Sequence, residues 1–139
     1  MAWVVDASVA VKWLVVEEDA DRAVALLSSN ERLLAPRWIM IELANVLWKK
    51  CRQNVLTPTV ARERLDLAAR YFAEVLDTPD LSAVLEMAIK LGHPVYDCIY
   101  IETALRQGVG LVTADRRLSV KARSIPELHV CDLSDWRAA

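Results

Sequence analysis

Short strand-like runs alternate with longer helical runs along the chain, and this alternation restricts the fold more than any other feature. Apolar runs predict strands at residues 2–5, 33–35, 110–113 and 129–133. Helical patterns are predicted at residues 7–14, 19–28, 38–52, 58–70, 81–91, 95–107 and 116–123. Residues 71–76 fit either a helix end or a strand. The alternation indicates an α/β fold with a mostly parallel sheet. In such sheets, sites form beyond the carboxyl ends of the strands, where the strand order reverses.

Composition indicates one folded domain spanning residues 1–139. The residues are 55% hydrophobic and 26% charged, with a net charge of -2, which excludes a disordered chain. At this length, folding removes about two-thirds of the chain surface from water, which is enough for a core. The pI near 5.7 argues against a protein that coats nucleic acid non-specifically. It still allows a local nucleic-acid site, because net charge says little about charge distribution.

Cysteine usage and hydropathy indicate a cytoplasmic protein. The three cysteines, Cys51, Cys98 and Cys131, are far apart and form no CxxC pair. This pattern favours neither a disulfide framework nor a zinc site, and it fits a reducing compartment. The segment 1–6 lacks the basic start of a signal peptide, and no uncharged stretch approaches the ~20 residues of a membrane span. We therefore expect no membrane partner.

Four acidic residues lie in segments that should be largely buried. Each is the only charge in an apolar stretch or directly follows one, and no Lys or Arg shares these runs: Asp6, Glu42, Asp97 and Asp115. A buried isolated carboxylate is costly and tends to become neutral unless a cation accompanies it. Taken one at a time, Asp6 and Asp115 also fit helix caps, and Glu42 fits an acid that pairs with a distant Arg. The conjunction of all four favours a shared site.

The predicted elements allow these four side chains to meet at the carboxyl edge of the sheet. Asp6 ends the first strand, and Asp115 lies just beyond the strand at 110–113. Asp97 and Glu42 fall in the first two turns of their helices. Two unit charges ~4 Å apart repel by about 4 kcal/mol at an effective dielectric of 20, so four carboxylates together require a divalent ion. Oxygen ligands favour Mg²⁺ or Mn²⁺ over zinc.

Two hydroxyls fit the same site. Ser8 lies two residues after Asp6, and Thr113 lies two residues before Asp115. In an extended segment this spacing places both side chains on one side. We expect Ser8 and Thr113 to orient the acidic ligands or a metal-bound water through hydrogen bonds. His93 and His129 form no recognisable catalytic pattern with each other or with a Ser or Cys nucleophile, and we assign them no catalytic role.

Four segments together resemble the PIN domain family, and the whole chain fits VapC-type toxins of type II toxin–antitoxin modules. The segments are VVDASV at 4–9, ELANVL at 42–47, YDCIYIETA at 96–104 and LVTADRRL at 111–118. The resemblance implies a three-layer α/β/α domain with a central, mostly parallel sheet. It implies a Mg²⁺- or Mn²⁺-dependent endoribonuclease with Asp6, Glu42, Asp97 and Asp115 at the family's acidic positions. It also implies a homodimer, a cognate antitoxin and structured RNA targets such as tRNA or rRNA.

We therefore expect hydrolysis of a phosphodiester bond to a 5′-phosphate and a 3′-hydroxyl. Asp6, Asp97 and Asp115 would be the main metal ligands, and Glu42 would bind metal through water or act as a base. Arg116 and Arg117 follow Asp115 directly and are close enough to contact flanking phosphates. Trp13, Trp38 and Trp48 fit either core packing or a groove for an antitoxin helix.

Two alternatives remain open at the level of sequence. A haloacid dehalogenase-type phosphatase also uses an Asp at the end of its first strand, but it needs a second Asp two residues later, where this chain has Ser8. The other alternative is a PIN-like module that binds RNA or protein without cleavage. Metal titration with an RNA substrate separates the enzyme from the binding module.

Overall fold

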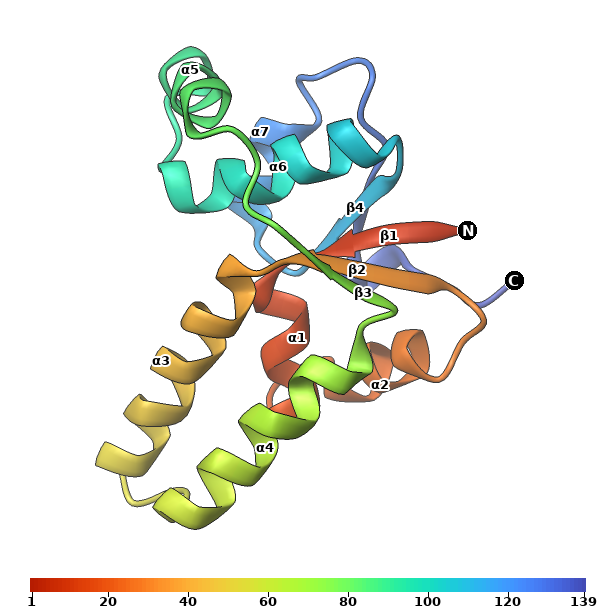
Figure 1. The fold of residues 1–139 in the computed structure, drawn as a ribbon. Coiled ribbons are helices and arrows are strands. Elements are labelled where there is room, and N and C mark those ends of the chain that lie inside the picture. Colours follow the sequence, from red (N-terminus) through yellow and green to blue (C-terminus); the bar gives the residue numbers. More distant parts are fainter.

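A five-stranded sheet with strand order β3-β2-β1-β4-β5 forms the centre of the computed structural model, which describes residues 1–139 (Figure 1). The strands are β1 (Ala2–Val5), β2 (Arg32–Pro36), β3 (Glu74–Leu76), β4 (Gly110–Thr113) and β5 (Val130–Asp132). All neighbouring strands pair in parallel. The predicted parallel sheet is therefore confirmed.

Helices cover both faces of the sheet and complete three layers. Their bounds are α1 (Ala7–Leu14), α2 (Ala20–Leu27), α3 (Trp38–Arg52), α4 (Pro58–Tyr71), α5 (Leu81–Leu91), α6 (Val95–Gln107) and α7 (Arg116–Ala122), with a short 3₁₀ turn at Leu133–Asp135. Figure 1 shows α5, α6 and α7 on one face and α1, α2 and α4 on the other, with α3 beside α4. The predicted α/β/α architecture is confirmed.

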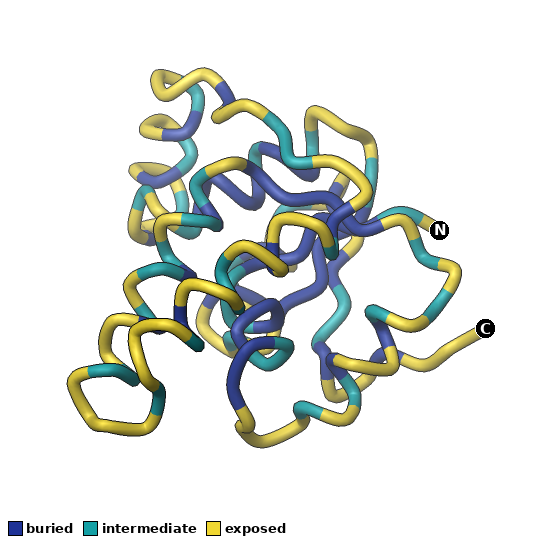
Figure 2. Tube along the Cα trace, turned by 60° about the horizontal axis from the view of Figure 1, so that its bottom comes forward, coloured by how far each residue is buried: buried dark blue, intermediate teal, exposed yellow.

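The central strands are buried on both sides, which explains their continuous apolar sequences. Val4, Val5, Leu34, Leu111 and Val112 have no exposed surface. In Figure 2 the buried trace runs through the middle of the molecule and the exposed trace lies around it. No helix of the chain combines the length and apolar character that crossing a membrane requires.

Helix ends and strand ends fall close to their predicted places. Gly92 and Gly108 follow α5 and α6 in the left-handed conformation, with φ of 61° and 64°. The ambiguous segment 71–76 divides, since α4 ends at Tyr71 and β3 begins at Glu74. The predicted strand at 129–133 is shorter than expected, because Leu133 already begins the 3₁₀ turn.

The strand order reverses at β1. From β1 the chain builds β2 and β3 on one side, and it then crosses to place β4 and β5 on the other. The carboxyl ends of β1 and β4 are therefore neighbours, with Val5 paired to Val112. This is the place where open α/β sheets form binding sites.

Candidate active site

Asp6 lies directly after β1 and is almost completely buried, with 3% of its surface exposed. It occupies the N-cap position of α1, but its side chain makes no capping hydrogen bond. Instead, Oδ1 accepts from Ser8 Oγ at 2.7 Å and Oδ2 accepts from Thr113 Oγ1 at 2.9 Å. Burial raises the pKa of Asp6 to about 7, against the lowering effect of the two hydroxyls.

The two hydroxyls connect the segment after β1 to the segment after β4. Ser8 Oγ and Thr113 Oγ1 lie 3.3 Å apart. Ser8 Oγ accepts from the backbone N–H of Ala114 at 2.9 Å, and Thr113 Oγ1 accepts from that of Asp115 at 3.0 Å. The contacts hold the Asp6 carboxylate against the end of β4.

Asp115 begins α7 and caps it. Its Oδ1 accepts from the backbone N–H groups of Arg117 at 2.9 Å and Leu118 at 3.2 Å. This is the ordinary N-cap contact that satisfies the free donors of a helix start. The charge of Asp115 also contributes to the raised pKa of Asp6, so the capping role does not remove it from the site.

Asp97 lies in the first turn of α6, and its Oδ2 is 2.8 Å from Nε2 of His93. The imidazole is buried, with 4% of its side chain exposed, whereas the Asp97 side chain is 25% exposed. His93 has no role in the sequence-based predictions, but in the structure it holds a candidate carboxylate. The four-residue spacing of His93 and Asp97 around Pro94 is the signal that could have found this contact.

Glu42 projects from α3 and accepts a hydrogen bond at Oε1 from the hydroxyl of Tyr100. Burial raises the pKa of Glu42, and the charge of Asp97 raises it further. The side chains of Tyr100 and Trp38 act in the opposite direction and lower this pKa. Tyr100 is 1% exposed and was not among the predicted site residues. It lies three residues after Asp97, and this spacing places both on one face of α6.

Neighbouring carboxylates affect the pKa values of Asp6 and Glu42. Asp97 and Asp115 both raise the pKa of Asp6, and Asp97 raises that of Glu42. No Lys or Arg forms an ion pair with any of the four. With the side chains as they stand, no group of three or more His, Cys, Asp or Glu is close enough to hold a metal ion.

Two exposed arginines and one ion-paired aspartate surround the site. Arg116 and Arg117 follow Asp115 and are exposed. Arg116 also borders a hollow of about 130 Å³ together with Thr113 and Asp132. Asp132, at the end of β5, is paired with Arg123 at 3.2 Å, whereas none of the four candidate carboxylates has a Lys or Arg partner.

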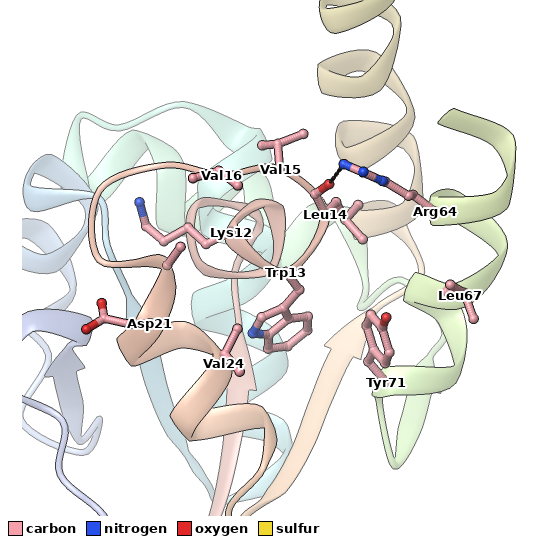
Figure 3. Close-up of a pocket in the computed structure, with 11 residues that line it drawn as sticks. Lys12, Trp13, Leu14, Val15, Val16, Asp21, Val24, Arg64, Leu67 and Tyr71 are labelled. Atoms are coloured by element: carbon pink, nitrogen blue, oxygen red, sulfur yellow. Dashed lines mark hydrogen bonds between the residues drawn. The ribbon is translucent and has the colours of Figure 1, made fainter. Parts of the chain in front are cut away.

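A larger, mainly apolar hollow of about 650 Å³ lies away from the carboxylates, between the α1–α2 segment and α4 (Figure 3). Trp13, Val16 and Val24 line one side, and Leu67 and Tyr71 project from α4 on the other. Arg64 crosses between the two sides, since its guanidinium donates to the carbonyl oxygen of Leu14. Of the tryptophans considered for a groove, Trp13 lines this hollow, whereas Trp38 and Trp48 lie elsewhere.

Comparison with known proteins identifies the family. The model of the PIN domain matches residues 3–124. Ribonuclease VapC3 of Pyrobaculum aerophilum is 33% identical over 125 residues, which cover 87% of this chain and 95% of the relative. The chain therefore belongs to the PIN domain family, and the resemblance drawn from the four sequence segments is confirmed.

Solved structures share the fold over nearly the whole chain. The crystal structure of PAE2754 from Pyrobaculum aerophilum matches with a TM-score of 0.74 and 27% identity, covering 96% of this chain and 93% of the other. VapBC2 from Rickettsia felis, solved bound to a DNA fragment from their promoter, matches with a TM-score of 0.69 and 14% identity. That match covers 99% of this chain and 100% of the other, and at this identity it concerns the fold alone.

Proposed function

We propose that this protein is a metal-dependent endoribonuclease and the toxin of a type II toxin–antitoxin system. The observation that carries the proposal is the set of four carboxylates, on segments that follow β1 and β4 and on α3 and α6, that no Lys or Arg neutralises. Membership of the PIN domain family and likeness to a relative named as a ribonuclease support the same activity.

The chemistry of the donor set fits Mg²⁺ or Mn²⁺. All candidate ligands are carboxylate oxygens, which hard divalent cations prefer. Asp6 is buried with a pKa raised to about 7, so a nearby cation would restore its charged form. Asp6, Asp97 and Asp115 would hold the ion, and Glu42 would bind it through water or act as a base. Because no three of these side chains are close enough to do so as they stand, binding would require them to turn toward the ion. When bound, a divalent ion lowers the pKa of water and offsets negative charge on the phosphoryl oxygens.

Residues of the chain orient the carboxylates before any ligand arrives. Ser8 and Thr113 bind both oxygens of Asp6, His93 contacts one oxygen of Asp97, and Tyr100 contacts one oxygen of Glu42. The other Asp97 oxygen has no protein donor. Such contacts limit the rotation of the acids and keep them directed at the site.

Exposed arginines supply the positive charge that an acidic site needs to admit RNA. Arg116 and Arg117 lie next to Asp115 and form no ion pair. We expect them to contact phosphates that flank the scissile bond. Phosphate contacts of this kind position a nucleic acid without reading its sequence.

Replacement of Asp6 by Asn tests the activity. We expect Asp6→Asn to abolish cleavage of tRNA or rRNA in Mg²⁺ or Mn²⁺, because the substitution removes the charge and leaves the shape. Denaturing gels and end analysis should show products with 5′-phosphate and 3′-hydroxyl ends, and a circular RNA should also be cut. Asp132→Asn is the matched control, since Asp132 ends a strand at the same edge but is paired with Arg123. Full activity of Asp6→Asn, or cleavage that persists in EDTA, would contradict the proposal.

No observation favours the two alternative functions. In a haloacid dehalogenase-type phosphatase, an Asp would stand where Ser8 donates its hydroxyl to Asp6. A binding module that had lost catalysis would have no need for the buried carboxylate of Asp6, which has no cation and costs stability.

Two protein partners complete the proposal. A cognate antitoxin would dock an apolar helix in the hollow of Figure 3, where exposed apolar side chains face water. A second copy of the chain would form a homodimer, as the resemblance to VapC-type toxins implies. Three free cysteines fit a protein that acts in the reducing cytoplasm.

A further inference from the structure

An aromatic pair borders the carboxylates and has no part in the function proposed above. The rings of Trp38 and Tyr96 stack with their centroids 5.2 Å apart and their planes 7° from parallel. Trp38 is half-buried against the small apolar cluster between α5 and α6. Tyr96 is 58% exposed. Trp38 therefore supports the Tyr96 ring from the protein side and leaves much of that ring in water.

Both residues are close to candidate carboxylates in the chain. Tyr96 directly precedes Asp97 at the start of α6. Trp38 precedes Glu42 by four residues on α3, a spacing that places the two on one helix face. The indole N–H of Trp38 is buried and faces Glu42 closely enough to lower the pKa of that carboxyl group. Trp38 thus connects the aromatic pair to the Glu42 side of the acidic site.

The sheet topology places the aromatic pair and the arginines on opposite sides of Asp6. Trp38 follows β2, Asp6 follows β1, and Arg116 follows β4, and β1 lies between the other two strands. Neighbouring strands are ~4.8 Å apart, so the segments that follow β2 and β4 are separated by about 10 Å. A short piece of single-stranded nucleic acid can therefore contact both, with phosphate at one end and a base at the other.

We infer that the Trp38–Tyr96 pair is a stacking platform for a nucleobase of single-stranded RNA beside the scissile phosphate. The inference rests on the proposed nuclease function and adds a binding subsite to it. Every base has a π-face, so the platform strengthens binding with little sequence preference. A flat, exposed ring beside an acidic site suits this ligand because a base contributes no negative charge to the site.

Binding of two RNA probes of equal charge tests the inference. The probes are a fluorescein-labelled adenylate decamer and a decamer of abasic ribose phosphates, measured by anisotropy in Mg²⁺. The Asp6→Asn protein is the parent, so that cleavage does not interfere. We expect Tyr96→Leu in this background to weaken adenylate binding about 10-fold, the effect of losing one stacked base, and to leave abasic binding unchanged.

Two further variants keep the test specific. Tyr96→Phe retains the ring and should bind both probes as the parent does. Trp48→Leu removes another exposed aromatic ring of α3, ten residues further along the helix, and should change neither probe. Circular dichroism establishes that each variant is folded.

Several outcomes would overturn the stacking platform. One is equal affinity of the parent for the adenylate and abasic decamers, including no measurable binding of either. A second is an unchanged affinity of Tyr96→Leu for the adenylate decamer, which would indicate that the aromatic pair contacts a protein partner and not RNA. A third is an equal loss of affinity for both probes, which would indicate a general defect of the variant. Cleavage by the wild-type protein is measured separately, so a failure of the nuclease proposal is distinguishable from a failure of this one.

Discussion

Asp6 is the one buried carboxylate of this molecule, and burial destabilises its charged form. Its oxygens have hydroxyl donors but no cation, and burial raises its pKa to about 7. A hydroxyl donor offsets only part of the cost of removing a charge from water. Asp6 is therefore the residue through which pH, divalent ions and stability are coupled.

We expect the free energy of unfolding of the metal-free protein to show this coupling. The pKa of Asp6 rises from 3.8 to about 7 on folding, so between these values the folded state binds the extra proton. Stability therefore falls as pH rises through this window, by roughly 4 kcal/mol in all, and levels off above it. Urea unfolding of wild type and Asp6→Asn from pH 4 to pH 8 measures the difference, because the variant lacks this contribution.

Divalent ions should offset this loss of stability at high pH. Mg²⁺ or Mn²⁺ that binds the ionised site stabilises the folded protein far more at pH 8 than at pH 5. The same addition should leave Asp6→Asn nearly unchanged. Equal pH profiles for wild type and Asp6→Asn, with or without the ion, would show that Asp6 does not titrate as its burial requires.

Arg117 provides a second prediction at the scale of one residue. If its guanidinium contacts a phosphate, Arg117→Ala weakens RNA binding for all sequences and reduces the salt slope of log K by about 1. Arg62→Ala, on the exposed side of α4, is the control and should retain the wild-type slope. An unchanged slope in Arg117→Ala would remove Arg117 from the RNA interface.

At the scale of elements, the contact between β1 and β4 decides whether a site exists. Trp3 pairs with Gly110 in this register, and the two segments that follow the strands share the Ser8–Thr113 contacts. The position has no room for a side chain, because a Cβ on Gly110 would lie 2.5 Å from Cζ3 of Trp3. Glycine at this point thus leaves room for the Trp3 ring beside β4.

We expect Gly110→Ala to lower the free energy of unfolding by about 1–3 kcal/mol, because the buried Trp3 ring must move. Gly108→Ala is the comparison, since that position has open space and its cost arises only from its left-handed backbone. Denaturant unfolding measures both. If Trp3→Leu did not reduce the cost of Gly110→Ala in a double-mutant cycle, the steric explanation would be wrong.

At the scale of the whole molecule, the acidic edge and the apolar hollow occupy different parts of the surface. The hollow lies between the α1–α2 segment and α4, whereas the carboxylates lie beyond β1 and β4 and in α3 and α6. This separation allows two kinds of partner, RNA at the edge and a protein helix in the hollow. It also allows each interaction to be removed independently.

Val24 tests the protein partner. Its side chain is 48% exposed and lines the hollow, so Val24→Asp should weaken binding of the antitoxin about 10-fold or more by placing a charge in an apolar contact. The partner to test is the product of the small gene expected directly upstream, by co-purification and titration. Val55→Asp, an exposed valine at the turn between α3 and α4, is the control. Antitoxin binding that survives Val24→Asp would place the partner elsewhere.

Local patterns were enough to predict most elements and the four acidic candidates. The bounds of β1, α1, α3, α5, α6 and β4 agree with the predictions, because caps, glycines and apolar runs act within a few residues. Segment 71–76 was undecided, since β3 exists only through its pairing with β2. The acids were recognisable because a lone charge in an apolar run is unusual and can be read without contacts.

Tertiary structure alone decided which groups meet. Tyr100 of α6 contacts Glu42 of α3, and Thr113 reaches Asp6 from a different strand. The sequence by itself determined the α/β elements and the acidic side chains, because both depend on local spacing and hydropathy. Strand order, and with it the neighbours of each carboxylate, is set by packing between segments up to 107 residues apart, which no local pattern records.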